Sequence, residues 1–194
     1  MIRRDLIAPL AAFMFGLVAL SLSALWVFWP ESETRQSAVG GPFQLTAMDG
    51  RRVTEADFRG KPHLIFFGFT HCPDICPTKL MEMSEVLRAA GDKARDVRAL
   101  FVTVDPERDT PMVLANYLSS FDSRILGLTG TQGEIDAMVK AHRAYARRVP
   151  TSSGDYTMDH TAIVYLMDKR GRFVGTFNVE RPPAEAAREL LSHL

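Results

Sequence analysis

The chain has 194 residues, of which 46% are hydrophobic and 24% charged, a balance that fills the core of one ordinary domain with appendages. Its 23 Lys and Arg residues equal its 23 Asp and Glu residues, and no basic run is visible, which argues against nucleic acid as a partner. The two cysteines are too few for a scaffold built on several disulfide bonds.

An uncharged apolar run occupies residues 6–29. A helix of this length reaches about 36 Å at about 1.5 Å per residue, and a bilayer core is about 30 Å thick. Arg3 and Arg4 precede the run, and the next basic residue is Arg35. The positive-inside rule therefore places residues 1–5 in the cytoplasm and the remainder of the chain in the periplasm or an equivalent space. A cleaved signal peptide is the alternative, but this run is longer than a usual signal core, so we expect a single-pass anchor in the inner (plasma) membrane.

Residues 30–40 are polar or small and predict a tether, which leaves residues 41–194 as the folded domain. Alternation on both sides of Asp49-Gly50 predicts an edge hairpin. Thr110 is an expected helix N-cap, and Thr131 with Glu134 has the capping-box pattern. Bounded apolar runs predict strands at 63–69, 98–104, 161–167 and 172–177, and helical spacing predicts helices at 77–90, 111–121, 131–143 and 182–194.

This alternation of strands and helices indicates the α/β class, with right-handed crossovers between parallel strands. The last hairpin should add an antiparallel pair to the same sheet.

One segment carries the candidate chemistry. Residues 69–77 read FTHCPDICP and lie between a buried strand and a helix, where α/β sheets gather their ligand and active sites. Cys76 should lie at the helix entry, whose partial positive charge favours a thiolate. A separation of four places the sulfurs of Cys72 and Cys76 near one face, if the loop is helical, so they can bind one ion or form a disulfide. A purely structural disulfide is an open alternative in an extracytoplasmic domain.

Two thiolates alone leave a soft metal ion under-coordinated, and His160 is the candidate third ligand because it directly precedes the expected strand at 161–167. Two sulfurs and an imidazole suit copper in both oxidation states, whereas structural zinc usually takes four protein ligands. Asp159 could fill a fourth position or orient His160. A lone histidine before a strand is more often structural or solvated than a metal ligand. We therefore expect His63, His142 and His193 not to be ligands.

The segments FFGFTHCPDICP, VDPERDTP and GDYTMDHTAIVYLMD resemble the signatures of the Sco/SenC family, copper proteins that assist cytochrome c oxidase assembly. The resemblance runs from about Gly41 to Phe177 and implies a thioredoxin-like central sheet flanked by helices. It implies that Cys72, Cys76 and His160 bind copper, as Cu(I), Cu(II) or both. The partners it implies are the copper-receiving subunit of cytochrome c oxidase and a copper donor protein.

The loop DPERDTP at residues 105–111 also follows a strand end and should border the same site. It is either a charged turn with a helix cap, or a support for the cysteine loop or a contact for a partner. Asp105 and Arg108 are its candidate supporting residues.

Two functions stay open at this point. The first is a metallochaperone that delivers copper to the dinuclear site of the oxidase. The second is a thiol-disulfide oxidoreductase with Cys72 and Cys76 as catalytic residues, which would reduce the cysteines of that site. No proline directly precedes Thr161, where thioredoxins have a cis-proline. A peroxiredoxin-like peroxidase is disfavoured, because Thr70 stands two residues before Cys72 rather than three.

Overall fold

The computed structural model describes residues 14–17, 20–21, 39–152 and 154–194. The chain divides into two units, residues 1–35 and 36–194. Residues 14–17 and 20–21 are helical, and the described residues include no helix that is both long and apolar enough to cross a membrane. The predicted anchor at 6–29 and tether at 30–40 lie largely outside the described residues and stay predictions.

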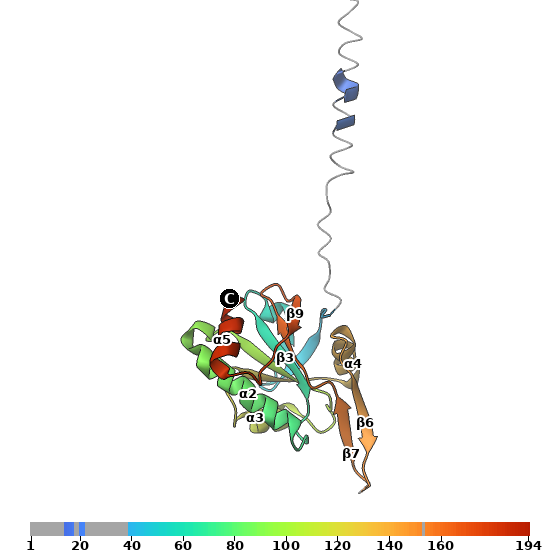
Figure 1. The fold of residues 1–194 in the computed structure, drawn as a ribbon. Helices are drawn as coiled ribbons and strands as arrows, with labels where there is room; N and C mark the ends of the chain where they lie inside the picture. Colours follow the sequence, from blue (N-terminus) through green and yellow to red (C-terminus); the bar gives the residue numbers. More distant parts are fainter. Residues whose placement is uncertain (1–13, 18–19, 22–38, 153) are drawn as a thin grey trace, which may run out of the picture. The chain divides into compact units, whose positions relative to one another are not determined.

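Within residues 39–152 and 154–194, seven strands form a mixed sheet in the order β2-β1-β5-β4-β3-β8-β9, and two more form a separate ribbon, β6-β7. Strands β3, β4 and β5 are parallel, and the remaining neighbours in the sheet are antiparallel. In Figure 1, α2 and α5 lie to the left of the sheet and α4 to its right. The elements are β1 (Gln44–Ala47), β2 (Arg52–Thr54), η2 (Glu55–Phe58), β3 (His63–Gly68), α2 (Ile75–Ala90), η3 (Gly91–Ala94), β4 (Arg98–Thr103), α3 (Pro111–Leu118), β5 (Ile125–Thr129), α4 (Gln132–Ala141), β6 (Ala146–Pro150), β7 (Tyr156–His160), β8 (Val164–Met167), β9 (Phe173–Thr176) and α5 (Pro183–Ser192).

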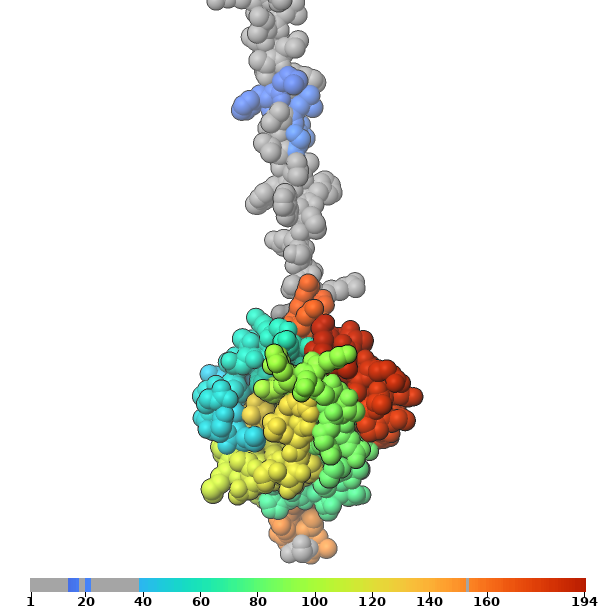
Figure 2. Space-filling view, turned by 90° about the vertical axis from the view of Figure 1, so that its left-hand side faces the viewer, coloured from blue at the N-terminus to red at the C-terminus, as the bar shows by residue number. Residues whose placement is uncertain are grey.

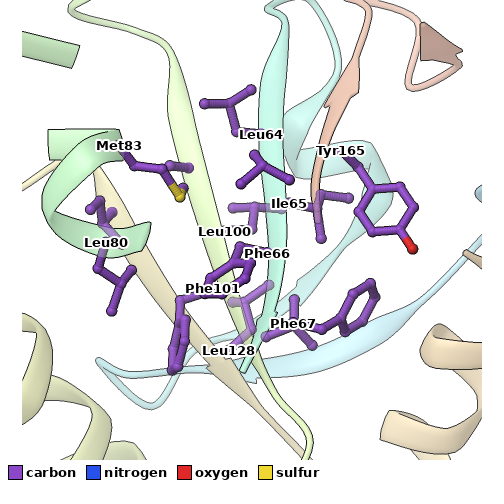
Figure 3. Packing of buried hydrophobic residues seen from close by; sticks show 14 of the residues in the cluster. Leu64, Ile65, Phe66, Phe67, Leu80, Met83, Leu100, Phe101, Leu128 and Tyr165 are labelled. Atoms are coloured by element: carbon purple, nitrogen blue, oxygen red, sulfur yellow. The ribbon is translucent and has the colours of Figure 1, made fainter. Parts of the chain in front are cut away.

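The core lies on both faces of β3, all of whose residues are buried. Phe66 is paired in register with Phe101 of β4, and the next residue, Phe67, turns to the other face and packs on Tyr165 of β8 with 5.8 Å between ring centroids. Figure 3 shows these rings together with Leu80 and Met83 of α2, which cover one face of the sheet. Burying each large apolar side chain contributes about 1.5–3 kcal/mol, so this central strand is a rigid base for the loop that follows it.

Most of the predicted elements are present. The edge hairpin is β1-β2, and both helix caps are formed, since Val113 N donates to Thr110 Oγ1 and Thr131 exchanges hydrogen bonds with Glu134. The largest differences in helix boundaries are that α2 begins at Ile75 instead of residue 77, that α3 ends at Leu118, and that α4 and α5 end at Ala141 and Ser192, earlier than expected; most other ends differ by a single residue.

The prediction failed between residues 144 and 163. The expected strand at 161–167 is shorter, as β8, and residues 146–160 hold the unpredicted antiparallel ribbon β6-β7. His160 is therefore the last residue of a strand and does not lie in a loop. The ribbon stands out from the sheet in Figure 1, and its tip projects below the domain in Figure 2. The residues of β6 and β7 are half-buried or exposed, and neither strand has the continuous apolar run that marks the core strands. Strand β5 was also not predicted.

Candidate metal centre

The cysteine loop connects β3 to α2. Cys72 N donates to Phe69 O at 3.2 Å, which folds the loop back on the end of the strand. Since α2 begins at Ile75, Cys76 lies in its first turn, and Cys76 N donates to Cys72 Sγ at 3.3 Å. Cys76 is fully buried and Cys72 half-buried, and both are free thiols, so the disulfide between them stays a prediction. One sulfur of the pair is thus fixed in the core while the other is accessible.

A glycine makes room for the buried sulfur. A methyl group on Gly68 would lie 2.5 Å from Phe101 Cε2 and 2.9 Å from Cys76 Sγ, both closer than real contacts allow. The last residue of β3 must therefore lack a side chain for Cys76 to occupy its position.

The imidazole of His160 reaches this pair from β7. Its Nε2 lies 3.6 Å from Cys76 Sγ, and its Nδ1 lies 3.0 Å from Thr161 O. A proton on Nδ1, donated to that carbonyl, leaves the Nε2 lone pair directed at the sulfurs, an arrangement common among metal-binding histidines. The ring of Phe69 holds the imidazole edge-to-face, with 5.7 Å between centroids.

The donor atoms of Cys72, Cys76 and His160 all lie within 4.8 Å of one another. Donors at about 2.0–2.3 Å from a single ion are about 3.5–4 Å apart, so closure of the site around an ion needs only a small shift. Two sulfurs and one imidazole nitrogen form a soft donor set that suits copper. The structure thus brings together the three residues that the sequence nominated.

Burial dominates the electrostatics of Cys76, contrary to the expectation of a thiolate favoured by the helix entry. The side chain is in the first turn of α2 but has no exposed surface, and this desolvation raises the pKa of the Cys76 thiol. A metal ion at this site must displace the proton, which couples metal binding to pH.

Asp159 does not join the donor group. Its side chain is exposed, and among the described residues the group of side chains placed to bind a metal ion consists of the two cysteines and His160. Successive residues of a strand point to opposite faces, so the side chain of Asp159 points away from that of His160. Asp159 is therefore not among the donors that converge here, and its expected role as a fourth ligand or as a residue that orients His160 stays a prediction.

Asp105 and Arg108 of the β4-α3 loop contact the ribbon. The Tyr156 hydroxyl donates to Asp105 Oδ1 at 2.9 Å, and Arg108 Nη1 donates to Tyr156 O at 3.1 Å. Arg108 also forms an ion pair with Asp105, which is buried.

Asp109 is the supporting residue that the sequence reasoning missed. Its fully buried carboxylate accepts hydrogen bonds from Thr70 N at 3.0 Å, from Thr70 Oγ1 at 2.6 Å and from Thr103 Oγ1 at 2.6 Å. These bonds attach the beginning of the cysteine loop to the end of β4. The expectation that residues 105–111 border the cysteine loop is confirmed, and the second aspartate of DPERDTP was the available signal.

The other histidines near the sheet lie outside the donor group. His63 starts β3, at the end of the strand opposite the cysteine loop, and burial lowers its pKa to about 4. His142 is buried, with Nδ1 2.9 Å from Met138 O, and burial lowers its pKa as well. His71, although next to Cys72, is exposed and has its Nδ1 3.2 Å from Thr70 Oγ1.

Fold and site together define a thioredoxin-like domain with a cysteine pair and a histidine at the carboxyl end of its central strand. The SCO1/SenC family model matches residues 31–194, and the chain belongs to this family.

Solved structures of relatives have the same fold. The structure of Bradyrhizobium japonicum ScoI with copper bound is 58% identical, with a TM-score of 0.78 over 80% of this chain and 99% of that one. Yeast Sco1 with copper bound is 38% identical, with a TM-score of 0.72 over 80% of this chain and 87% of that one.

Among curated proteins, the mitochondrial SCO1 homolog of Homo sapiens is 40% identical over 159 residues, which is 80% of this chain and 53% of the human protein. The chain thus spans little more than half the length of this relative.

Proposed function

We propose that this domain binds one copper ion through Cys72 Sγ, Cys76 Sγ and His160 Nε2 and delivers it to cytochrome c oxidase. The observation that carries the proposal is the convergence of the three donor atoms within 4.8 Å. The copper-bound ScoI of Bradyrhizobium japonicum, 58% identical to this chain, supports copper as the metal. Copper is the cargo in this account, and the protein supplies the donors, their spacing and a route to the surface.

The difference in burial between the cysteines suggests how the ion is passed on. Cys76 belongs to the core, whereas Cys72 is half-buried at the edge of the site. Three protein donors leave a coordination position open for a ligand of the acceptor, which would approach beside Cys72. Ligand exchange can then proceed without a step in which copper is free.

The expected partners and location follow from the family and the sequence. The acceptor is the oxidase subunit with the dinuclear copper site, and a donor protein supplies the ion. Residues 6–29 anchor the chain in the inner membrane and residues 30–40 tether a domain that faces the periplasm or an equivalent space. A tether of this kind would hold the copper site near a membrane-bound acceptor.

Copper binding by single variants tests the ligand set. Cys72→Ala and Cys76→Ala should each abolish tight binding, because one thiolate cannot hold Cu(I) against a competing chelator. His160→Ala should weaken Cu(II) binding strongly, because the two sulfurs remain but the nitrogen donor that Cu(II) prefers is lost. His71→Ala is the matched control, a histidine next to the motif but outside the cluster, and should bind as the wild type does. A Cu(II) affinity unchanged in His160→Ala contradicts the three-donor site.

A second function rests on the state of the cysteines. Both are free, and Cys76 N donates to the more accessible Cys72 Sγ at 3.3 Å, so the two sulfurs lie side by side. Such a dithiol could reduce a disulfide of the acceptor: the two thiols become one disulfide, and the acceptor gains two electrons and two protons to yield two thiols. Turnover of a disulfide substrate without copper, lost in Cys72→Ala and retained in His160→Ala, would favour this function.

A further inference from the structure

Three side chains of β7 share one face of the ribbon. Side chains alternate along a strand, so Tyr156, Met158 and His160 point to the same side and Asp159 to the other. Asp159 is exposed, whereas Tyr156, Met158 and His160 are half-buried, as is Thr157 on the opposite face. His160 therefore depends on the ribbon for its direction, and the ribbon lies outside the seven-stranded sheet (Figure 1). Within the described part of the chain, the backbone of β7 pairs only with β6.

The opposite end of the same face is fixed to the domain by Tyr156. Its hydroxyl donates to Asp105 Oδ1 at 2.9 Å, and Asp105 has only 1% of its surface exposed. The backbone is held as well, because Arg108 Nη1 donates to Tyr156 O at 3.1 Å. Arg108 is itself paired with Asp105. The buried carboxylate of Asp105 thus holds the hydroxyl of Tyr156 and also holds Arg108, which in turn binds the backbone carbonyl of Tyr156.

The ring of Tyr156 is enclosed by two guanidinium groups. Cζ of Arg108 lies 3.8 Å from the ring centroid and Cζ of Arg148 lies 3.9 Å from it. Two groups this close cannot occupy one face, so the ring lies between them. Arg148 belongs to β6 and pairs with Glu107 at 2.6 Å, which ties the second strand to the same loop.

Such an anchor determines the register of the strand at the metal site. A slip of one residue would turn every side chain of β7 to the other face and would send the imidazole away from Cys76. The position of Tyr156 therefore fixes where His160, four residues along the same face, meets the sulfur at 3.6 Å.

We propose that Tyr156, held by Asp105 and Arg108, is a positioning residue that sets the contribution of His160 to copper binding. The inference rests on the copper site proposed above. Cu(I) is satisfied by two thiolates, whereas Cu(II) prefers nitrogen and a higher coordination number. Loss of the anchor should therefore weaken Cu(II) far more than Cu(I). Loss of a hydrogen-bonded partner behind a metal ligand typically lowers affinity about 10- to 100-fold, and because Tyr156 acts on His160 only through the strand, we expect a fall of up to about 10-fold for Cu(II).

The test uses the full chain with graded variants. Tyr156→Phe keeps the ring between the guanidinium groups and removes only the hydroxyl, whereas Tyr156→Leu removes both contacts. Tyr145→Phe is the matched control, a tyrosine at the base of the same ribbon with an exposed ring. Affinities for Cu(I) and Cu(II), the imidazole nitrogen hyperfine coupling of bound Cu(II), and the NMR resonances of the His160 ring in metal-free protein are measured for each.

We expect Cu(II) affinity to fall from wild type to Tyr156→Phe to Tyr156→Leu, with weakened nitrogen coupling and shifted His160 resonances, while Cu(I) affinity changes less than threefold. Tyr145→Phe should match the wild type. The inference is overturned if the Tyr156 variants keep the wild-type Cu(II) affinity, nitrogen coupling and His160 resonances. It is also overturned if the variants lose thermal stability while these three measurements stay at their wild-type values. Wild-type protein without copper binding would refute the proposed function instead, and the metal-free resonances would then decide whether Tyr156 positions His160.

Discussion

Gly68 packs against the candidate metal centre with no room for a side chain, and Gly68→Ala tests this packing. A methyl group there would lie 2.5 Å from Phe101 Cε2 and 2.9 Å from Cys76 Sγ. Phe101 and Cys76 are both fully buried, so neither can move into free space. Overpacking a core in this way costs about 1–3 kcal/mol. The sulfur should also be displaced from the Nε2 of His160, which weakens copper binding.

Urea unfolding of the metal-free protein measures this cost. With a denaturant dependence of about 1–3 kcal/mol per molar urea, the midpoint of Gly68→Ala should fall by about 1 M. Gly175→Ala is the matched control, another strand glycine, where an added methyl group meets no atom within 4 Å. Its midpoint should stay within about 0.5 kcal/mol of the wild type. If Gly68→Ala unfolds at the wild-type midpoint and binds copper equally well, Cys76 does not occupy the position described here.

Three further changes have expected outcomes. Asp109→Ala removes the acceptor for Thr70 and Thr103, should destabilise the domain by about 3–5 kcal/mol in urea unfolding, and should raise the reactivity of the cysteine loop toward an alkylating agent. Burial lowers the pKa of His63 from 6.5 to about 4, so the neutral ring is favoured in the folded state. The contribution of His63 to the free energy of unfolding should therefore be at its full value above about pH 6.5 and should fall by up to about 3 kcal/mol toward pH 4. Urea midpoints measured across this pH range should show the loss, and the loss should be smaller in His63→Leu. Since burial raises the pKa of Cys76, copper affinity should increase with pH, and calorimetry in buffers of different ionisation enthalpy should detect release of at least one proton per copper bound; equal affinity at pH 6 and pH 8 would contradict this.

The sequence predicted correctly those features that depend on neighbouring residues in the chain. The apolar run of β3 predicted a strand buried on both faces, and Thr110 and Thr131 predicted two helix starts from side-chain chemistry alone. The cysteine pair and His160 were identified by residue type and spacing, and the structure places their donor atoms together.

The remaining features depend on contacts between distant segments. The β6 strand has exposed arginines and no apolar run, so pairing with β7 is not visible in its own sequence. Asp109 resembles any charged turn residue until Thr70 is folded against it. The pKa of Cys76 follows from its burial beside Phe101, which outweighs the helix entry that the sequence suggested.

X-ray absorption at the copper edge of the full chain, loaded with one equivalent of copper, tests the central claim most directly. The account predicts two sulfur scatterers at about 2.2–2.3 Å and one imidazole nitrogen at about 2.0 Å, with the nitrogen lost in His160→Ala. A first shell without sulfur, or an imidazole signal that persists unchanged in His160→Ala, would contradict a copper site formed by Cys72, Cys76 and His160.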